Sequence, residues 1–480
     1  MASALPHLPV LRWGAEYSSL ERVELENHRT GEPLAEISQA NAGLLRRDLR
    51  RAAEAAASLR ALPTRELFER AKHAAELFLD GELSLGDGVA QSAARYREQL
   101  SATSGLPLTL ARTNQEKIAS VLRELSTVLF GLTRGLEPEL LDAGLGEHER
   151  IPVWFTPQAN ALGAVLPSNS PGVNALWIPA LALKTALVLK PGHGDPWTPL
   201  RICRALIAAG FPEKAFALYP TDHEGAAVIL EACERALLFG DARTTQAWAH
   251  DPRIEIHGPG RSKVLIGADE IGNWEEHLDV LVRSVAENGG RSCVNASCIV
   301  VPAQADEIAE ALASKLSTMV PRRYDDPAAN LAAFPDPTLA ERIDGALEAA
   351  LGAPGARDLC ASRRAGPRRV TLDGASYLLP TLVRCERLDH PLANTEYLFP
   401  FASVVELPEE QALDWMGDSL VVSAITRDPA LLRRLTGSRR IGRLNLGPLP
   451  TSSVRWDQPH EGNLFDFLYA RGAIQRAERW

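Results

Sequence analysis

The chain has 480 residues, of which 45% are hydrophobic and 23% are charged. That length and composition are typical of a globular protein with two or three domains. The formal net charge is −10, with 51 Lys and Arg against 61 Asp and Glu, so the sequence lacks the basic surface with which proteins bind nucleic acids.

The chain shows no sign of a secreted or membrane-embedded protein. Its first residues lack the charged and apolar regions of a secretory signal. The most apolar segment, residues 172–190, is interrupted by Pro179 and Lys184, so we predict no membrane helix. The six cysteines show neither CxxC nor Cys/His spacing, so we expect no zinc site, a reducing compartment and a cytoplasmic location.

The first third of the chain is predicted to be helical. Apolar residues recur at helical spacing over 44–62, 64–83 and 113–132, with charged residues between them. Residues 135–154 are rich in Gly and Pro and return to an extended pattern, which indicates an arm or a crossover.

From Ala186 onward, short apolar runs alternate with helical patterns. This alternation predicts a parallel, doubly wound sheet. The expected elements are strands over 186–190, 215–220 and 236–240, with helices over 196–210 and 223–235 between them. We expect Thr198 to cap the first of these helices and Asp222 the second.

Such sheets bind ligands at the carboxyl ends of their strands. Lys190, Gly225 and Gly240 are therefore placed where a dinucleotide would lie. No GxGxxG motif follows any of the strands, so the spacing alone is a weak indication of a nucleotide site.

Six segments occur in the order and at the separations typical of the aldehyde dehydrogenase superfamily, which the chain resembles over most of its length. They are LPSNSPGV, LVLKPGHGDPWTP, LLFGDART, HGPGRSK, NGGRSC and NTEYLFPF. The HGPGRS and FGD segments are most similar to the acyl-CoA reductase branch, which includes the fatty acid reductases of luminous bacteria.

The resemblance implies an α/β fold with three parts. These are a Rossmann-type dinucleotide-binding domain over 1–258, a catalytic domain over 259–440, and a C-terminal return and oligomerisation segment over 441–480. An oligomerisation arm is expected over 131–150. Members of the family usually form homodimers or homotetramers through such an arm and a C-terminal strand.

The resemblance makes Cys293 the nucleophile. A thiolate that adds to a carbonyl carbon creates an oxyanion, which needs hydrogen-bond donors. In the family these are the cysteine's own amide and an Asn side chain that corresponds to Asn169. Gly289 and Gly290 allow the tight turn that presents the thiol. The alternative interpretation is a buried structural cysteine, which is how we interpret Cys298.

The expected cofactor is NAD or NADP. Lys190 matches the family lysine that binds the adenosine ribose or a 2′-phosphate, and Glu396 matches the glutamate that binds the nicotinamide ribose. His193 replaces an acid that is common in the family, so NADP should be tolerated.

Asp241 follows Gly240 where the family has a phosphate-binding Gly-Ser. A carboxylate there is unfavourable unless it caps the next helix. Arg243 could offset its charge.

His257 stands where hydrolytic members carry the glutamate that activates water. We therefore predict that the acyl-enzyme hydrolyses slowly and that the reaction is reversible reduction of an acyl thioester to an aldehyde, with CoA as acyl donor or acceptor. The first alternative is oxidation of an aldehyde to a carboxylate, with His257 or another group activating water. A second is a catalytically silent scaffold subunit. His460 either lines the pocket or is a structural loop histidine.

Overall fold

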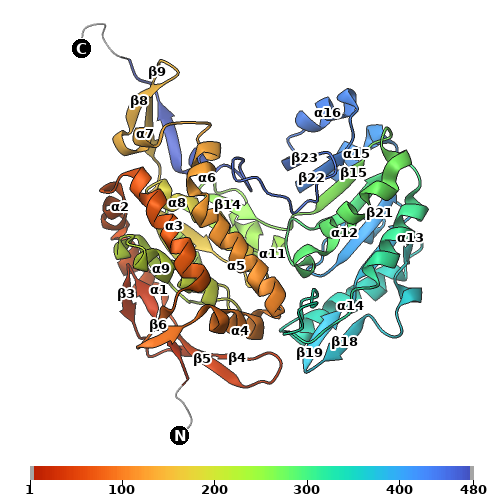
Figure 1. Cartoon of the computed structure of the whole chain (residues 1–480), viewed down its shortest axis with the longest axis horizontal. Coiled ribbons are helices and arrows are strands. Elements are labelled where there is room, and N and C mark those ends of the chain that lie inside the picture. Colours follow the sequence, from red (N-terminus) through yellow and green to blue (C-terminus); the bar gives the residue numbers. More distant parts are fainter. Residues whose placement is uncertain (1–4, 476–480) are drawn as a thin grey trace.

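The structure, a computed structural model, describes residues 5–475. Figure 1 shows two lobes, with the first half of the chain in one and most of the second half in the other. Each lobe is built around a seven-stranded sheet with helices on both faces. The predicted α/β architecture with two sheet domains is therefore confirmed.

The sheet of the first lobe has a parallel core of five strands, with an antiparallel hairpin added at one edge. In spatial order its strands are β14 (Ile254–His257), β13 (Arg235–Phe239), β10 (Ala161–Val165), β11 (Ala186–Lys190), β12 (Phe216–Leu218), β2 (Val10–Arg12) and β3 (Ala15–Tyr17). Because the core is parallel, Lys190, Phe239 and His257 all end strands at the same edge.

Alternate side chains of β11 enter two different cores. Leu187 and Leu189 pack with the large helical layer on one face, whereas Ala186 and Val188 pack with the helices on the other. The helices of this lobe are α1 (Ala42–Leu49), α2 (Ala52–Arg60), α3 (Thr64–Asp80), α4 (Ala93–Ser104), α5 (Leu108–Arg123), α6 (Leu125–Leu132), α7 (Pro138–Ala143), α8 (Pro179–Ala182), α9 (Trp197–Ala208), α10 (His223–Ala232) and α11 (Ala242–Thr245).

The alternating strands and helices predicted after Ala186 are confirmed as β11, α9, β12, α10 and β13. Asp222 caps α10 as expected, because its side chain accepts a hydrogen bond from Gly225 N. The prediction for Thr198 is wrong. Its amide and hydroxyl both donate to Asp195 Oδ1, at 3.0 and 2.7 Å. The cap is therefore the acid three residues earlier, and Thr198 lies inside the first turn.

The second lobe is also layered. Cys298 and Val300 face one core and Ile299 and Val301 the other, and Cys298 is buried, as predicted. The strands are β17 (Ala356–Asp358), β20 (Thr381–Cys385), β21 (Phe401–Glu406), β16 (Ala296–Val301), β15 (Ser262–Ile266), β22 (Ser419–Ile425) and β23 (Ile441–Leu446). The helices are α12 (Leu278–Ala286), α13 (Ala305–Leu316), α14 (Pro337–Leu351), α15 (Glu409–Met416) and α16 (Pro429–Thr436).

Small sheets and hairpins complete the two lobes. They are β1 (His7–Leu8) with β5 (Pro33–Ser38) and β4 (Arg22–Glu26), β6 (Leu83–Gly86) with β7 (Val89–Gln91), and β18 (Arg369–Leu372) with β19 (Ala375–Leu378). Within residues 5–475, we find no helix that combines the length and apolarity needed to span a bilayer.

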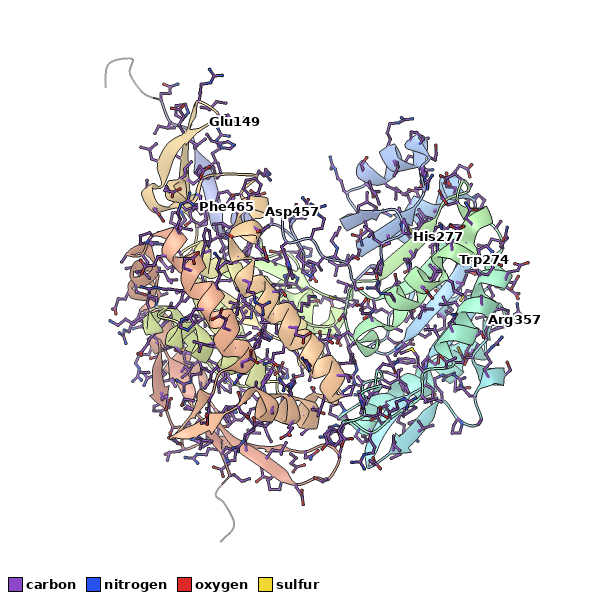
Figure 2. The ribbon with its side chains drawn as sticks, in the orientation of Figure 1. Glu149, Trp274, His277, Arg357, Asp457 and Phe465 are labelled. Carbon is purple, nitrogen blue, oxygen red and sulfur yellow. The ribbon has the colours of Figure 1, made fainter. Side chains whose placement is uncertain are left out.

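A three-stranded arm projects from the first lobe. It contains the hairpin of β8 (Leu145–His148) and β9 (Ile151–Pro157), and β24 (Tyr469–Gly472) pairs with β9. Figure 2 places Glu149 at the tip and Phe465 at the base, where its ring packs on Phe155 with centroids 5.1 Å apart. The oligomerisation roles of 131–150 and 441–480 stay predictions, and 476–480 lie outside the described residues.

A C-terminal loop, residues 447–463, links the two lobes and packs on α6. Asn463 Nδ2 donates to the carbonyl of Leu132 at 3.0 Å, and the side-chain oxygen of Asn463 caps α17 (Leu464–Leu468). A Cβ atom on Gly131 would collide with the backbone carbonyl of Asp457. Glycine in α6 thus permits the close approach of this loop.

We predict that Gly131→Ala destabilises the first lobe by about 1–3 kcal/mol, the usual cost of overpacking. The matched control is Gly345→Ala in α14, where an added Cβ meets nothing within 4 Å. Both changes gain helix propensity of about 0.5–1 kcal/mol, so the control should be stabilised. Differential scanning calorimetry measures both, and equal shifts for the two variants would show that the loop does not need this glycine.

Candidate active site

Cys293 lies in the loop between η5 (Glu287–Gly290) and β16, and it is partly exposed. Gly290 has a φ of +69°, and a Cβ there would collide with the backbone of Phe399. The carbonyl of Cys293 accepts a hydrogen bond from Ser262 Oγ at 2.9 Å, and a Cβ on Gly260 would collide with it. Two glycines therefore allow the backbone packing that holds the thiol in place.

The nearest acidic group to the thiol comes from the C-terminal loop. Cys293 Sγ donates a hydrogen bond to Glu461 Oε1 at 3.7 Å. Burial raises the pKa of Cys293 well above its usual value, and the charges of Glu461 and Glu396 raise it further. The resting site therefore holds a neutral thiol beside a carboxylate.

Glu461 also binds His257. His257 Nδ1 lies 3.0 Å from Glu461 Oε2, and both side chains are under a tenth exposed. Hydrogen bonding and attraction to His257, with the nearby Lys117, lower the pKa of Glu461 to about 2 against the effect of burial. A carboxylate can only accept, so His257 carries its proton on Nδ1. The Phe239 ring stacks on His257 at 4.5 Å.

His460 lies beside this pair and is held by a cation. An Arg443 nitrogen contacts His460 Nδ1, and Arg443 also donates to Thr451 O at 2.6 Å. Burial, with the positive charges of Lys117 and Arg443, lowers the pKa of His460 to about 3. His460 is therefore neutral, and it lines a cavity of the site.

Asn169 is held against the thiol loop. Its Nδ2 donates to the carbonyl of Arg291 at 2.8 Å, two residues before Cys293. The structure therefore brings Asn169 and Cys293 into one neighbourhood, as the resemblance implies. The amide would have to divide its two N–H donors between this carbonyl and an oxyanion.

On the other side of the loop, Glu396 accepts a hydrogen bond from the amide of Arg261. Burial raises the pKa of Glu396 to about 7. Glu396, the thiol loop and the glycine-rich segment 258–261 thus pack together.

The remaining predicted cofactor residues lie along the carboxyl edge of the first sheet. Lys190 ends β11, and burial lowers its pKa, whereas the charge of Asp222 raises it. His193 is exposed in the following turn. Gly225 is buried in the first turn of α10, where a Cβ would collide with Thr221.

The uncertainty at Gly240 and Asp241 is resolved in favour of capping. Asp241 Oδ1 accepts hydrogen bonds from the Thr244 amide and hydroxyl, each at 2.8 Å. Arg243 lies 3.5 Å from the same carboxylate. Asp241 is therefore the N-cap of α11.

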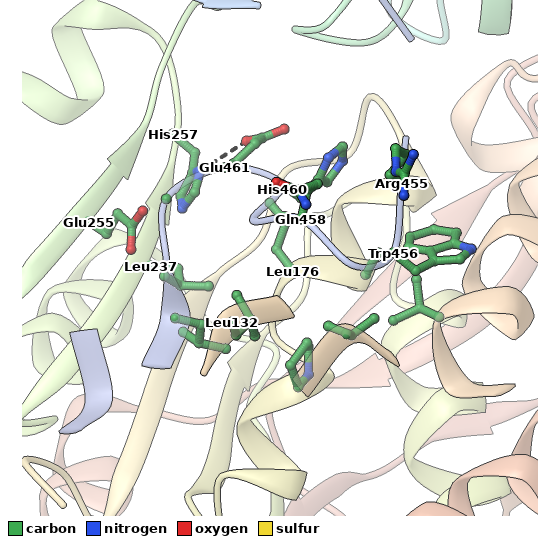
Figure 3. Close-up of a pocket in the computed structure, with 16 residues that line it drawn as sticks. Leu132, Leu176, Leu237, Glu255, His257, Arg455, Trp456, Gln458, His460 and Glu461 are labelled. Atoms are coloured by element: carbon green, nitrogen blue, oxygen red, sulfur yellow. Dashed lines mark hydrogen bonds and ion pairs between the residues drawn. The ribbon is translucent and has the colours of Figure 1, made fainter. Parts of the chain in front are cut away.

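Two hollows meet at His257 and Glu461. A cleft of about 950 Å³ runs between the lobes and is lined by segments 256–261, 418–420 and 439–442. A second cavity, of about 570 Å³, lies behind His257 and is mostly apolar. Figure 3 shows Glu255 and His257 side by side at one end of it and Trp456 at the other.

Comparison with known proteins shows which family this site belongs to. The sequence model of the Aldehyde dehydrogenase family matches residues 15–463. The chain belongs to the aldehyde dehydrogenase family.

Individual relatives are distant. Geranial dehydrogenase of Castellaniella defragrans is 25% identical over 48% of this chain and 49% of the relative. Malonate-semialdehyde dehydrogenase of Pseudomonas aeruginosa is 24% identical over 43% and 46%. The matches thus span about half the length of these curated relatives.

Solved structures share the whole fold. The aldehyde dehydrogenase KauB of Pseudomonas aeruginosa superposes with a TM-score of 0.79 at 18% identity, covering 97% of this chain and 96% of that one. Indole-3-acetaldehyde dehydrogenase in complex with NAD+ gives 0.76 at 18%, covering 97% and 95%.

The sequence analysis missed Glu461, Lys117 and Arg443. Glu461 follows His460, for which the sequence leaves a pocket role and a structural role open, but it lies 168 residues from Cys293. Lys117 is one charge on an amphipathic helix, and Arg443 lies within a strand. The structure also corrects one premise: the site does contain a carboxylate, although residue 257 is histidine.

We predict that Glu461→Gln makes the thiol more acidic, because it removes a negative charge that stabilises the neutral form. The midpoint for alkylation of Cys293 by iodoacetamide should move toward acid pH by about one pH unit. At neutral pH alkylation should therefore be faster.

Mass spectrometry can follow Cys293 alone, because the other five cysteines are buried. Glu255→Gln is the matched control, since this half-buried acid lines a cavity that Glu461 also lines, and the thiol donates to Glu461. Alkylation that is unchanged or slower in Glu461→Gln would refute this account of the thiol.

Proposed function

We propose that the protein is an NAD(P)-dependent aldehyde dehydrogenase that oxidises an aldehyde to a carboxylate. The contact of Glu461 with both Cys293 and His257 supports this proposal most directly. It supplies the site with a buried, ionised carboxylate that can serve as a general base.

Cys293 adds to the carbonyl carbon, and its proton passes to Glu461. Because the resting thiolate is unfavourable, proton transfer and addition are coupled. The oxyanion forms near the Cys293 amide and the Asn169 side chain, which act as donors. When bound, NAD(P) accepts the hydride that leaves the adduct, so that the aldehyde carbon becomes a thioester.

Water then attacks the thioester and releases the carboxylate and the thiol. After the thiol proton has passed from Glu461 to solvent, Glu461 takes the proton of the attacking water and returns it to the departing sulfur. His257 holds the other oxygen of Glu461 by Nδ1–H. The Nε2 atom of His257 is buried without a hydrogen-bond partner among the described residues. No donor among the described residues therefore binds Nε2 and pulls the ring away from Glu461.

The residues present fit a dinucleotide. Glu396 is a half-buried carboxylate bonded to backbone amides, and it would accept the hydroxyls of the nicotinamide ribose. Lys190 would hold the adenosine ribose. His193 and Gly225 would lie beside that end, and Gly240 beside the phosphates. With Asp241 acting as a cap, the α11 terminus offers the phosphates less positive charge than an uncapped helix would.

Acyl-thioester reduction is the second candidate function. His257 stands in the place of the family's catalytic glutamate, which favours a long-lived thioester that CoA could accept or donate. A product assay with an aldehyde and NAD(P), with and without CoA, separates the two functions. Calorimetric titration with the dinucleotide separates both from a silent scaffold, which would not bind it.

We predict that Cys293→Ala abolishes aldehyde-dependent NAD(P)H formation but leaves dinucleotide binding intact. Glu461→Gln should lower steady-state turnover about 10²–10⁴-fold, the usual contribution of a general base. It should keep a burst of one NAD(P)H per site, because the more acidic thiol of this variant can lose its proton to solvent and still add to the aldehyde, whereas hydrolysis becomes the slow step.

Stopped-flow fluorescence of NAD(P)H resolves the burst. Fast, CoA-independent acid production by Glu461→Gln would exclude this residue as the base. A wild-type enzyme that turns over only with CoA would favour the second candidate.

We predict that Lys190→Met weakens dinucleotide binding about tenfold, the equivalent of one modest interaction of about 1.4 kcal/mol. NADP should bind no more than about tenfold weaker than NAD, because His193 repels a 2′-phosphate less than a carboxylate would. Exposed Lys214 offers the control Lys214→Met. Calorimetric titration would refute the assignment if both lysine variants bound the dinucleotide equally well.

A further inference from the structure

A third hollow approaches the thiol loop from the side of α5. Its empty volume is about 700 Å³, and its walls come from α5, the thiol loop and the C-terminal loop. Ser292 and Val294, the two neighbours of Cys293, both line it. The lining residues are Thr113, Asn114, Lys117, Glu287, Asn288, Ser292, Val294, Asn295, Ser452, Val454 and Trp456. A molecule in this cavity therefore lies against the segment that carries the nucleophile, outside the interlobe cleft.

Most polar groups of this cavity are already bonded to one another. Asn114 Nδ2 donates to Asn288 Oδ1 at 2.7 Å, and Asn288 Nδ2 donates to Ser292 Oγ at 3.0 Å. Ser452 Oγ donates to Glu287 at 2.5 Å, and Arg283 lies 3.6 Å from the same acid. These groups hold the walls of the cavity together and leave few donors for a ligand.

Lys117 differs from these polar groups in having no bonded partner in the cavity. Of the residues that line this cavity it is the one cation. Lys117 is half-buried, and in the part of the chain that the structure describes its ammonium has no ion pair and no hydrogen bond, unlike that of Lys184 or Lys72. It lies beside Gly172, three residues after Asn169, where an added Cβ would come within 3.7 Å of Nζ.

The side chains around the thiol carry more positive than negative charge. Lys117 and Arg443 both lie close enough to Glu461 and Cys293 for their charges to interact with them. Glu461 is the one acid that attracts both cations. Glu287 also attracts Lys117, but it lies 3.6 Å from a third cation, Arg283. Cys293 and His460 are neutral at rest. Burial of the two cations lowers the pKa of each. A single negative charge in the cavity would offset this cost of burial.

We propose that this cavity binds an aldehyde that carries a carboxylate, with the carboxylate paired to Lys117 and the aldehyde carbon at Cys293. This inference rests on the proposed oxidation of aldehydes and names the class of aldehyde. A monoanion matches the single excess charge, and the fixed lysine on α5 sets the orientation of the substrate.

Lys117 has one other role to be separated from this one. Its positive charge lowers the pKa of Cys293, so a variant without the lysine could lose activity through the nucleophile alone. Such a loss would be the same for every aldehyde. A lysine that binds the substrate instead affects charged aldehydes selectively.

The experiment uses two aldehyde series of equal chain length, the ω-oxo carboxylates and the unsubstituted alkanals, with NAD(P). Wild type, Lys117→Met and Lys117→Arg are compared by kcat/KM for both series. The matched control is Lys315→Met, an exposed lysine in α13. Wild type should prefer the ω-oxo carboxylate about tenfold or more, as expected for a buried charge pair.

Lys117→Met should lower kcat/KM for the ω-oxo carboxylate about tenfold or more, mainly through KM, and for the alkanal less than about twofold. Lys117→Arg should keep most of the preference, and Lys315→Met should change neither value. An equal loss for both series would assign Lys117 to the thiol and overturn the inference.

Two other outcomes would also overturn it. Cys293-dependent oxidation of alkanals in preference to ω-oxo carboxylates would leave the proposed function standing and refute the substrate class. No NAD(P)H formation from either series, with dinucleotide binding intact, would refute the proposed function and this inference together.

Discussion

The hydrogen bonds of Glu461 are the interaction on which the rest of the site depends. One oxygen of this carboxylate accepts from the thiol of the second lobe and the other binds the histidine that ends a strand of the first. This one side chain therefore bonds a residue of each lobe. Its position depends in turn on the packing of the C-terminal loop on α6, where a glycine and Asn463 hold the loop.

The charges around Cys293 keep its thiol protonated when no substrate is bound. A desolvated thiol beside an ionised acid holds its proton, so the nucleophile is unreactive until a carbonyl group is present. His257 and Lys117 keep Glu461 ionised despite its burial. Lys117 also lines the cavity on the α5 side. The same cation that keeps Glu461 ionised is therefore the one that a ligand in this cavity would meet.

The sequence predicted the fold well because its signals were local. The alternation after Ala186 and the capping acid Asp222 each depend on residues within a few positions. Thr198 was misplaced because Asp195, three residues earlier, accepts hydrogen bonds from its amide and its hydroxyl, which places Thr198 inside the helix as a donor.

The site was less predictable. The ordered motifs indicated Cys293 and Asn169, and the structure puts them in one neighbourhood. Replacement of the usual glutamate by His257 suggested a site without a carboxylate. Glu461 supplies one from a distant loop, and no periodicity or spacing along the chain reveals such a pairing.

The separation of Cys293 and Glu461 along the chain also has a consequence during synthesis. A ribosome makes the protein from its N-terminus, and early segments begin to fold first. The thiol loop and its strand can form while the 168 residues up to Glu461 are still being added. Until that loop has docked on α6, the nascent chain carries a cysteine but no base. The nucleophile and its base are therefore brought together late, after both lobes have been synthesised.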